Sequence, residues 1–205
     1  LDNNNNTLID LVLVILDGST RDLGTSYTLI NDVIIPHLGS EPEKRILVAI
    51  NQCDIAMKGK YWNYKENRPE PQLEKFLKEK VDSVKRRIKE GTGVDVDPIY
   101  YSAGYKEIGE KQNPYNLSKL LYNIIEHTPE VKRISYIDNI SKDKDKWKHD
   151  DKEKDYKGEI KKEFSERVRD ALIGGKAGAE IGAKIAGTVG AAIGAVIGGI
   201  FGFFF

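Results

Sequence analysis

Two polar side chains, Asn51 and Asp54, follow an apolar run and could together read the edge of a guanine base. The run at residues 45–50 (RILVAI) is typical of a buried strand, and Asn51-Gln52-Cys53-Asp54 comes directly after it. The Asp54 carboxylate would accept two hydrogen bonds, from the ring N–H and the exocyclic amine of guanine. Asn51 would support the loop and reach the opposite edge of the base. The alternative for Asp54 is a loop aspartate that caps the following helix.

A second apolar run ends in another short motif. Residues 98–101 (PIYY) lead into Ser102-Ala103-Gly104. The chain resembles the superfamily of P-loop GTPases. The base-recognition half of these proteins has the same order of elements and motifs: strand, Asn-x-x-Asp, helix, strand and Ser-Ala. The chain is most similar to the Era/TrmE-like branch, often labelled 50S ribosome-binding GTPases. The resemblance covers roughly residues 8–133 and includes residues 10–14, 68–71, 84–88 and 113–120.

The resemblance implies GTP or GDP as the ligand and gives each motif residue a role. Ala103 would offer its backbone N–H to the guanine carbonyl, and Ser102 would order the loop. Gln52 stands where relatives more commonly carry a lysine whose stem stacks on the ring; its methylenes could still cover the base, without the charge. Gly104 also stands where many relatives carry lysine. The expected nucleotide-binding residues are Asn51, Gln52, Asp54, Ser102 and Ala103.

The motifs that hold phosphates and magnesium are not recognisable in this sequence. A phosphate loop has the form G-x-x-x-x-G-K-[ST], whose backbone N–H groups and lysine surround the anion. Residues 18–24 (GSTRDLG) contain no lysine, and no Asp-x-x-Gly switch precedes residue 45. We therefore expect a longer parent protein that supplies the phosphate grip and Mg²⁺ upstream of Leu1. No catalytic residue and no metal ligand is assigned to this chain, which we expect to be inactive alone.

Charge and cysteine content exclude several classes of protein. Lys+Arg and Asp+Glu number 32 each, and a net charge of zero argues against a general nucleic-acid surface. A ribosome or RNA partner therefore rests on the family resemblance alone. The single cysteine, Cys53, excludes an internal disulfide and fits a reducing, cytoplasmic compartment. We expect Cys53 to be a packing residue. His37, His127 and His149 have no spacing typical of a metal site.

Three apolar runs predict parallel strands, at residues 9–17, 45–50 and 98–102. The first is nearly continuous and rich in β-branched residues, which predicts burial on both faces. Alternation with helices implies right-handed crossovers and an open sheet whose ligands sit at the carboxyl ends of the strands. The predicted fold class is α/β: a partial doubly wound parallel sheet, the C-terminal half of a G domain, followed by a charged linker and a glycine-rich C-terminal helix.

Periodic apolar residues predict three helices. The first would be capped by Thr25 or Ser26, would be limited by Pro36, and would present one apolar face: Leu29, Ile30, Val33, Ile34 and Leu38. The second would run from Pro71 to Gly91 with buried positions Leu73, Phe76, Leu77, Val81, Val84 and Ile88. The third would start at Pro114 and end before residue 128. Residues 55–71 are predicted to be a loop that folds over its own helix with Tyr61, Trp62 and Tyr64; the alternative is that these aromatic residues form a partner surface.

The first predicted strand would lack one of its neighbours in this chain. In the family, the strand matching 9–17 pairs with the strand that feeds the phosphate loop. Without that neighbour it would present an apolar edge, so we expect the 205 residues alone to be poorly soluble.

Residues 138–170 carry interspersed charges of both signs, which predicts a solvated linker that becomes an amphipathic helix around Ile160, Phe164, Val168 and Leu172.

The tail from Gly174 onward carries small residues at every fourth position, beside a column of bulky ones. On a helix this pattern forms a glycine groove that lets two backbones approach closely. After Lys184 no charge occurs for about 21 residues, roughly 31 Å of helix and close to the thickness of a bilayer core. A membrane anchor, a self-associating glycine zipper and a soluble tail that packs on a partner all remain open.

The sequence thus predicts three parts: a half G domain over residues 1–133, a charged linker and amphipathic helix over 134–170, and a glycine-zipper tail over 171–205. The expected function is guanine nucleotide binding, with GTP hydrolysis in the complete parent. The alternative is a membrane-associated, self-assembling interaction protein with a non-catalytic G-domain remnant. A different nucleotide-binding α/β protein, in which residues 51–54 match by coincidence, is a further alternative.

Overall fold

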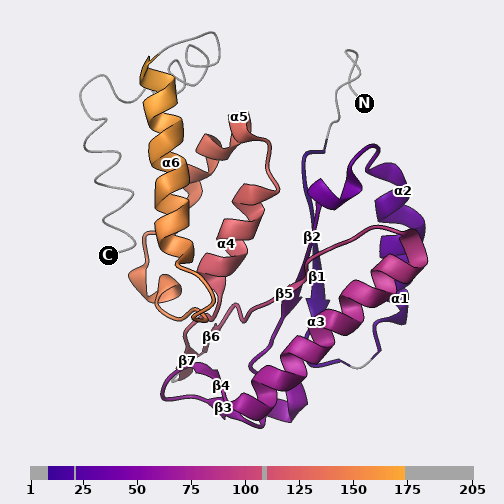
Figure 1. The fold of residues 1–205 in the computed structure, drawn as a ribbon. Helices are drawn as coiled ribbons and strands as arrows, with labels where there is room; N and C mark the ends of the chain where they lie inside the picture. Colours follow the sequence, from indigo (N-terminus) through magenta and orange to yellow (C-terminus); the bar gives the residue numbers. More distant parts are fainter. Residues whose placement is uncertain (1–8, 21, 108–109, 174–205) are drawn as a thin grey trace.

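The structure, a computed structural model, describes residues 9–20, 22–107 and 110–173 (Figure 1). Within these ranges the protein is mixed α/β, with a three-stranded parallel sheet. The strands β1 (Val12–Asp17), β2 (Ile46–Asn51) and β5 (Ile99–Tyr100) lie in the order β1-β2-β5. Asp17 pairs with Asn51, and Ile50 pairs with Tyr100. The predicted parallel sheet is confirmed, and its carboxyl ends meet at one edge.

The central strand β2 is buried on both faces, as a parallel strand covered by helices requires. Residues 46–50 are all buried. On one face Ile46, Val48 and Ile50 belong to the main core, together with side chains from the helices at residues 24–37 and 71–92. On the other face Ala49 packs with Ile99, Tyr101 and residues of the helix at 117–126. Figure 1 shows these helices on opposite sides of the sheet.

The edge strand β1 is buried on one face only. Val14 and Leu16 lie in the core, whereas Ile15 between them is 56% exposed. Among the described strands β1 pairs with β2 alone, so its other edge is open. The prediction that the first strand is buried on both faces is therefore wrong. The helical layer on the second face reaches Leu13 but does not extend over Ile15.

The first helical segment begins earlier than predicted and has a different cap. It consists of α1 (Gly24–Thr28), a π-helical turn (Leu29–Ile34) and α2 (Ile35–His37). Neither Thr25 nor Ser26 caps it. Instead the Asp22 carboxylate accepts the N–H of Gly24 at 2.9 Å. A short 3-10 helix (Pro42–Lys44) then leads into β2.

The π-helical turn changes which side chains this segment buries. Pro36 has no N–H, and its ring would crowd the carbonyl four residues earlier in a regular α-helix. A wider turn just before it, in which the N–H of Ile35 bonds to the carbonyl of Ile30, gives that ring room. The buried positions are consequently five apart, at Ile30 and Ile35. Leu29 and Val33, predicted on the buried face, are each 50% exposed.

The long helix α3 (Pro71–Thr92) follows the predicted pattern closely. Its buried positions are Leu73, Leu77, Val84 and Ile88. The helix passes through Gly91 and ends one residue later. Gly93 then adopts a left-handed conformation (φ 75°), and its N–H bonds to the carbonyl of Lys89, a common helix end.

Two small hairpins were not predicted. Residues 56–69, expected to be a loop, contain a 3-10 helix (Ala56–Gly59) and the antiparallel pair β3 (Trp62–Asn63) and β4 (Arg68–Pro69). Trp62 is buried in the main core, edge-on to Tyr115 with ring centroids 5.4 Å apart. Tyr61 and Tyr64 remain exposed. The second hairpin joins β6 (Tyr105–Glu107) to β7 (Glu110–Gln112).

The C-terminal part of the described chain packs on the third helix. The elements are α4 (Leu117–Glu126), α5 (Glu130–Arg133), two 3-10 helices (Ile134–Asn139 and Lys144–Trp147) and α6 (Tyr156–Ile173). The helix α4 starts at Leu117 and not at Pro114. Figure 1 shows α6 beside α4. A second core of Ile125, Ile140, Trp147, Ile160 and Phe164 joins them. The amphipathic helix is confirmed at Ile160 and Phe164. In the predicted linker most charged side chains are exposed, whereas Ile140 and Trp147 are buried in this second core.

No helix in residues 9–173, as far as these are described, is both long and apolar enough to cross a bilayer. The glycine-striped tail predicted over residues 171–205 lies almost entirely outside the described residues. Its membrane contact and its self-association therefore stay predictions.

Candidate functional site

The two motifs predicted to recognise a base lie side by side at the carboxyl edge of the sheet. Asn51 is the last residue of β2, and Ala103 follows β5. The Asn51 side-chain oxygen Oδ1 accepts the backbone N–H of Ala103 at 3.2 Å. One step further along, the N–H of Cys53 bonds to the carbonyl of Tyr101 at 3.2 Å. The predicted convergence of the two loops is thus confirmed by direct contact.

Asp54 is held below the surface by a residue that the sequence did not indicate. Its side chain is only 5% exposed, and Oδ2 accepts a 3.0 Å hydrogen bond from Nε2 of Gln112. Gln112, the last residue of β7, is itself 8% exposed. A carboxylate with so little access to water needs hydrogen-bond donors from the protein or from a ligand. Asp54 therefore has the burial and the acceptor chemistry of a recognition group.

The loop after β1 packs directly on the first motif. The N–H of Gly18 bonds to the carbonyl of Asn51 at 2.7 Å, and a Cβ at Gly18 would collide with that same carbonyl. Gln52, next in the chain, has a φ of 60° in the left-handed region, and its side chain is exposed. The exposed methylenes of Gln52 are therefore free to cover a flat ligand lying against the loop.

Lys80 of α3 holds the loop after β1 in place. Its Nζ donates to the backbone carbonyls of Gly18 and Thr20, both at 2.7 Å, and to that of Asp17 at 3.3 Å. Burial lowers the pKa of Lys80, and the Asp17 carboxylate partly opposes that shift. Ser19 donates its hydroxyl and its backbone N–H to Asp17, and the hydroxyl bond is the main reason that the pKa of Asp17 is lowered.

The second motif is built into the structure by backbone pairing. Ser102 and Tyr115 exchange two backbone hydrogen bonds, at 3.0 and 2.9 Å, and Ser102 is buried. Its hydroxyl accepts the N–H of Gly104 at 3.2 Å, so Ser102 orders the turn in which Ala103 lies exposed. Gly104 has a φ of 69°. A Cβ at Gly104 would collide with the carbonyl of Gln112, so glycine is the residue that fits at this position.

Cys53 is buried beneath the first motif, as predicted. Burial raises the pKa of its thiol well above the ordinary value, and the negative charge of Asp54 adds to that shift. Since the thiolate is the reactive form of cysteine, this environment disfavours nucleophilic or redox chemistry at Cys53.

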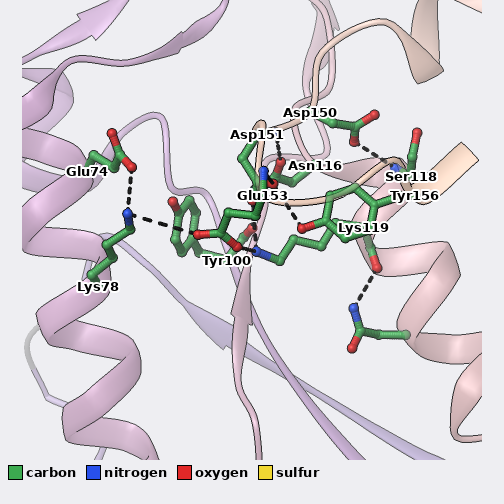
Figure 2. A network of polar contacts seen from close by, with 11 residues as sticks. Glu74, Lys78, Tyr100, Asn116, Ser118, Lys119, Asp150, Asp151, Glu153 and Tyr156 are labelled. Carbon is green, nitrogen blue, oxygen red and sulfur yellow. Dashed lines mark hydrogen bonds and ion pairs between the residues drawn. The ribbon is translucent and has the colours of Figure 1, made fainter.

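A buried polar network fixes the segment behind the second motif (Figure 2). Asn116 donates to the carbonyl of Tyr100 at 3.1 Å and accepts the N–H of Asp151 at 2.7 Å. Lys119 bonds to Asp151 at 2.8 Å and Glu153 at 2.6 Å. Burial alone would lower the pKa of Lys119, but these two carboxylates outweigh it and raise that pKa. Residues 149–156 are therefore tied to the strand end that carries Ser102 and Ala103.

One cavity lies near the carboxyl ends of the strands, and a larger one lies at their amino ends. One of about 280 Å³ opens beside the second motif and is lined by Ala103, Gly104, Tyr105 and Gln112, with Asp143 and Lys146 opposite. A larger cavity of about 600 Å³ lies at the amino ends of the strands, where Asp10, Arg45 and Arg133 line it. Its charges are of both signs, and it contains none of the predicted site residues. Of the five predicted nucleotide-binding residues, Ala103 alone lines the smaller cavity.

The described residues offer no metal site. No group of three or more His, Cys, Asp or Glu side chains in the described ranges is arranged to hold a metal ion.

Sequence reasoning located the two loops but missed the residues that hold them. Gln112 and Asn116 follow shortly after the second motif and Lys80 lies in α3, and no local pattern marked Gln112 or Lys80 as part of the site. Comparison with known proteins gives no further guidance, since no family model, no curated protein and no solved structure matches the chain.

Proposed function

We propose that this chain recognises the guanine base of GTP or GDP, and that its sheet is the C-terminal half of a doubly wound G domain. The observation that carries the proposal is the hydrogen bond between Asn51 and Ala103. It joins two loops, 52 residues apart in the chain, that the sequence assigned to one base site. Ligands of open α/β sheets bind at this same edge, outside the carboxyl ends of the strands.

In the proposed complex each residue acts on a different part of the base. Asp54 accepts the ring N–H and the exocyclic amine of guanine, which adenine cannot offer in that arrangement. The N–H of Ala103, which donates to Asn51 Oδ1 in this structure, donates to the guanine carbonyl once the base displaces that oxygen, and Ser102 keeps the turn in the required shape. Gln52, exposed beside Asn51, covers one face of the ring. In this proposal a guanine is held by the side chains of Asn51, Gln52, Asp54 and Ser102 together with the backbone N–H of Ala103.

The strength of this recognition is limited. A good bidentate contact to a base is worth about 1–3 kcal/mol, whereas a dissociation constant of 1 mM already requires about 4 kcal/mol. Base contacts alone should therefore give millimolar affinity or weaker. GTP hydrolysis needs a phosphate grip and Mg²⁺ as well. Hydrolysis is proposed only for a protein in which such groups accompany this chain, and not for these residues by themselves.

The proposal is tested by the substitution Asp54→Asn. An amide at this position can donate to the additional carbonyl of xanthine but cannot accept both guanine donors. Guanosine binding should weaken by about 10- to 100-fold, the equivalent of 1–3 kcal/mol, and xanthosine binding should strengthen. Ligand-detected saturation-transfer NMR measures both at millimolar ligand concentration.

The matched control is Asp82→Asn, the same substitution at an exposed position of α3. It should leave both affinities unchanged. If Asp54→Asn has the same guanosine and xanthosine affinities as the unaltered chain, or if the unaltered chain prefers adenosine, guanine recognition at this site is wrong.

The second candidate function, membrane-associated self-assembly, concerns residues outside the described ranges. No contact among the described residues favours it over base recognition. A ribosome or RNA partner is likewise proposed by family resemblance alone, and the zero net charge of the chain gives it no support.

A further inference from the structure

The carboxylate proposed to read guanine already has an amide donor inside the protein. Nε2 of Gln112 donates to Oδ2 of Asp54 at 3.0 Å, and both side chains are buried. The base-facing N–H of Ala103 also has a protein partner, since it donates to Asn51 Oδ1. One oxygen of Asp54 and the N–H of Ala103 are thus already paired within the chain.

Gln112 is placed over Asp54 by backbone packing on two sides. On one side the carbonyl of Gln112 lies so close to Gly104 that only glycine fits there. On the other side the buried side chain of Asn67 donates to the carbonyls of Asn113 and Pro114, at 2.9 and 3.0 Å. The position of Gln112 is therefore set by the fold and not by the reach of a flexible side chain alone.

Guanine and the Gln112 amide compete for the same acceptor. The base offers two parallel N–H donors, and a carboxylate accepts them with one oxygen each. Gln112 holds one of those two oxygens. Resting on the proposed function, we propose that Gln112 is an internal surrogate for guanine, which the base must displace from Asp54 before it binds with both donors. Gln112 thereby lowers the affinity of the site and makes it selective for ligands with two adjacent donors.

The proposal predicts that removing the amide strengthens guanosine binding. Gln112→Ala should lower the guanosine dissociation constant of the 205-residue chain about tenfold, the equivalent of 1.4 kcal/mol, because no hydrogen bond then has to be broken. Gln112→Asn, whose amide is one methylene shorter and falls short of Oδ2, should act in the same direction. Adenosine binding should not change. Saturation-transfer NMR with guanosine and adenosine measures all of these affinities.

Gln72→Ala is the matched control, because Gln72 is exposed in the first turn of α3. It should behave like the unaltered chain. Tighter guanosine binding in either Gln112 variant, and not in Gln72→Ala, supports the proposal. If the unaltered chain prefers guanosine and both Gln112 variants bind it equally or more weakly, the surrogate role is wrong while base recognition stands. If neither the chain nor any variant prefers guanosine over adenosine, both the surrogate role and the proposed function are wrong.

Discussion

At the scale of single residues, the site depends on positions where the backbone approaches another segment too closely for any side chain. Gly104 is the clearest case. Its left-handed φ of 69° disfavours other residues, and the carbonyl of Gln112 occupies the space of a Cβ. Gly39 has a similar φ of 75° but nothing within 4 Å of its Cβ position. Alanine substitutions at these two glycines therefore separate the cost of the left-handed backbone from the cost of the clash at Gly104.

Gly104→Ala should destabilise the protein by about 2–4 kcal/mol, whereas Gly39→Ala should cost only about 1–2 kcal/mol for the left-handed conformation. The difference between the two losses of stability measures the cost of the clash between the new Cβ and the carbonyl of Gln112. Urea denaturation followed by circular dichroism measures both. Equal losses in the two variants would mean that the segment carrying Gln112 is free to move away from Gly104.

At the scale of elements, α6 is fixed to the domain by charge as well as by its apolar face. Glu163 of α6 accepts hydrogen bonds from Arg133 at 3.0 Å and from Arg167 at 2.9 Å. Burial raises the pKa of Glu163, but the hydrogen bonds from Arg167 and Arg133 outweigh burial and lower that pKa. The lowered pKa means that this carboxylate stabilises the folded state when it is ionised.

Glu163→Gln should cost roughly 1.5–3 kcal/mol at pH 7, because hydrogen bonds to a charged group are lost. The stabilisation by Glu163 is complete above its ordinary pKa of 4.5 and is lost as the pH falls through the lowered folded-state value. Urea melts from pH 7 to 3 should therefore converge for the two proteins. Glu79→Gln, at an exposed i,i+4 pair, should change stability by less than about 0.5 kcal/mol. A constant difference at all pH values would contradict the assignment.

At the scale of the whole molecule, the sheet has an open side. Along β1 the side chain of Ile15 is largely exposed, as is Ile9 just before the strand. Within the described ranges nothing pairs with the outer edge of β1. An exposed apolar edge strand is a template for pairing with another chain. The expectation of poor solubility thus has a structural cause at this edge.

Ile15→Lys should reduce self-association of the chain without a large loss of stability, because a charge on an edge strand opposes edge-to-edge pairing and little core packing is removed. Sedimentation velocity at several concentrations should show a shift from larger species toward monomer. Val33→Lys, on the exposed side of the first helical segment, is the control and should not shift the distribution. If the unaltered chain is a soluble monomer, the edge of β1 does not cause self-association.

Local patterns predicted some elements well and others poorly. The regular three-four spacing of α3 predicted its buried face, because those side chains all pack into the main core. The same reasoning failed at Leu29 and Val33, where a proline changed the helical repeat. Between residues 138 and 156 it missed the burial of Ile140 and Trp147, which pack with Ile125, Ile160 and Phe164 from other elements.

By itself the sequence determined the parallel sheet, the strand ends and the two short motifs that meet there, because strand periodicity and connection rules act over short stretches of chain. Only the tertiary structure decided what surrounds them. Gln112 reaches Asp54 and Lys80 reaches the loop after β1 from segments far away in the chain. A hydrogen bond between such distant residues depends on how whole elements pack, and no local spacing of residue types encodes it.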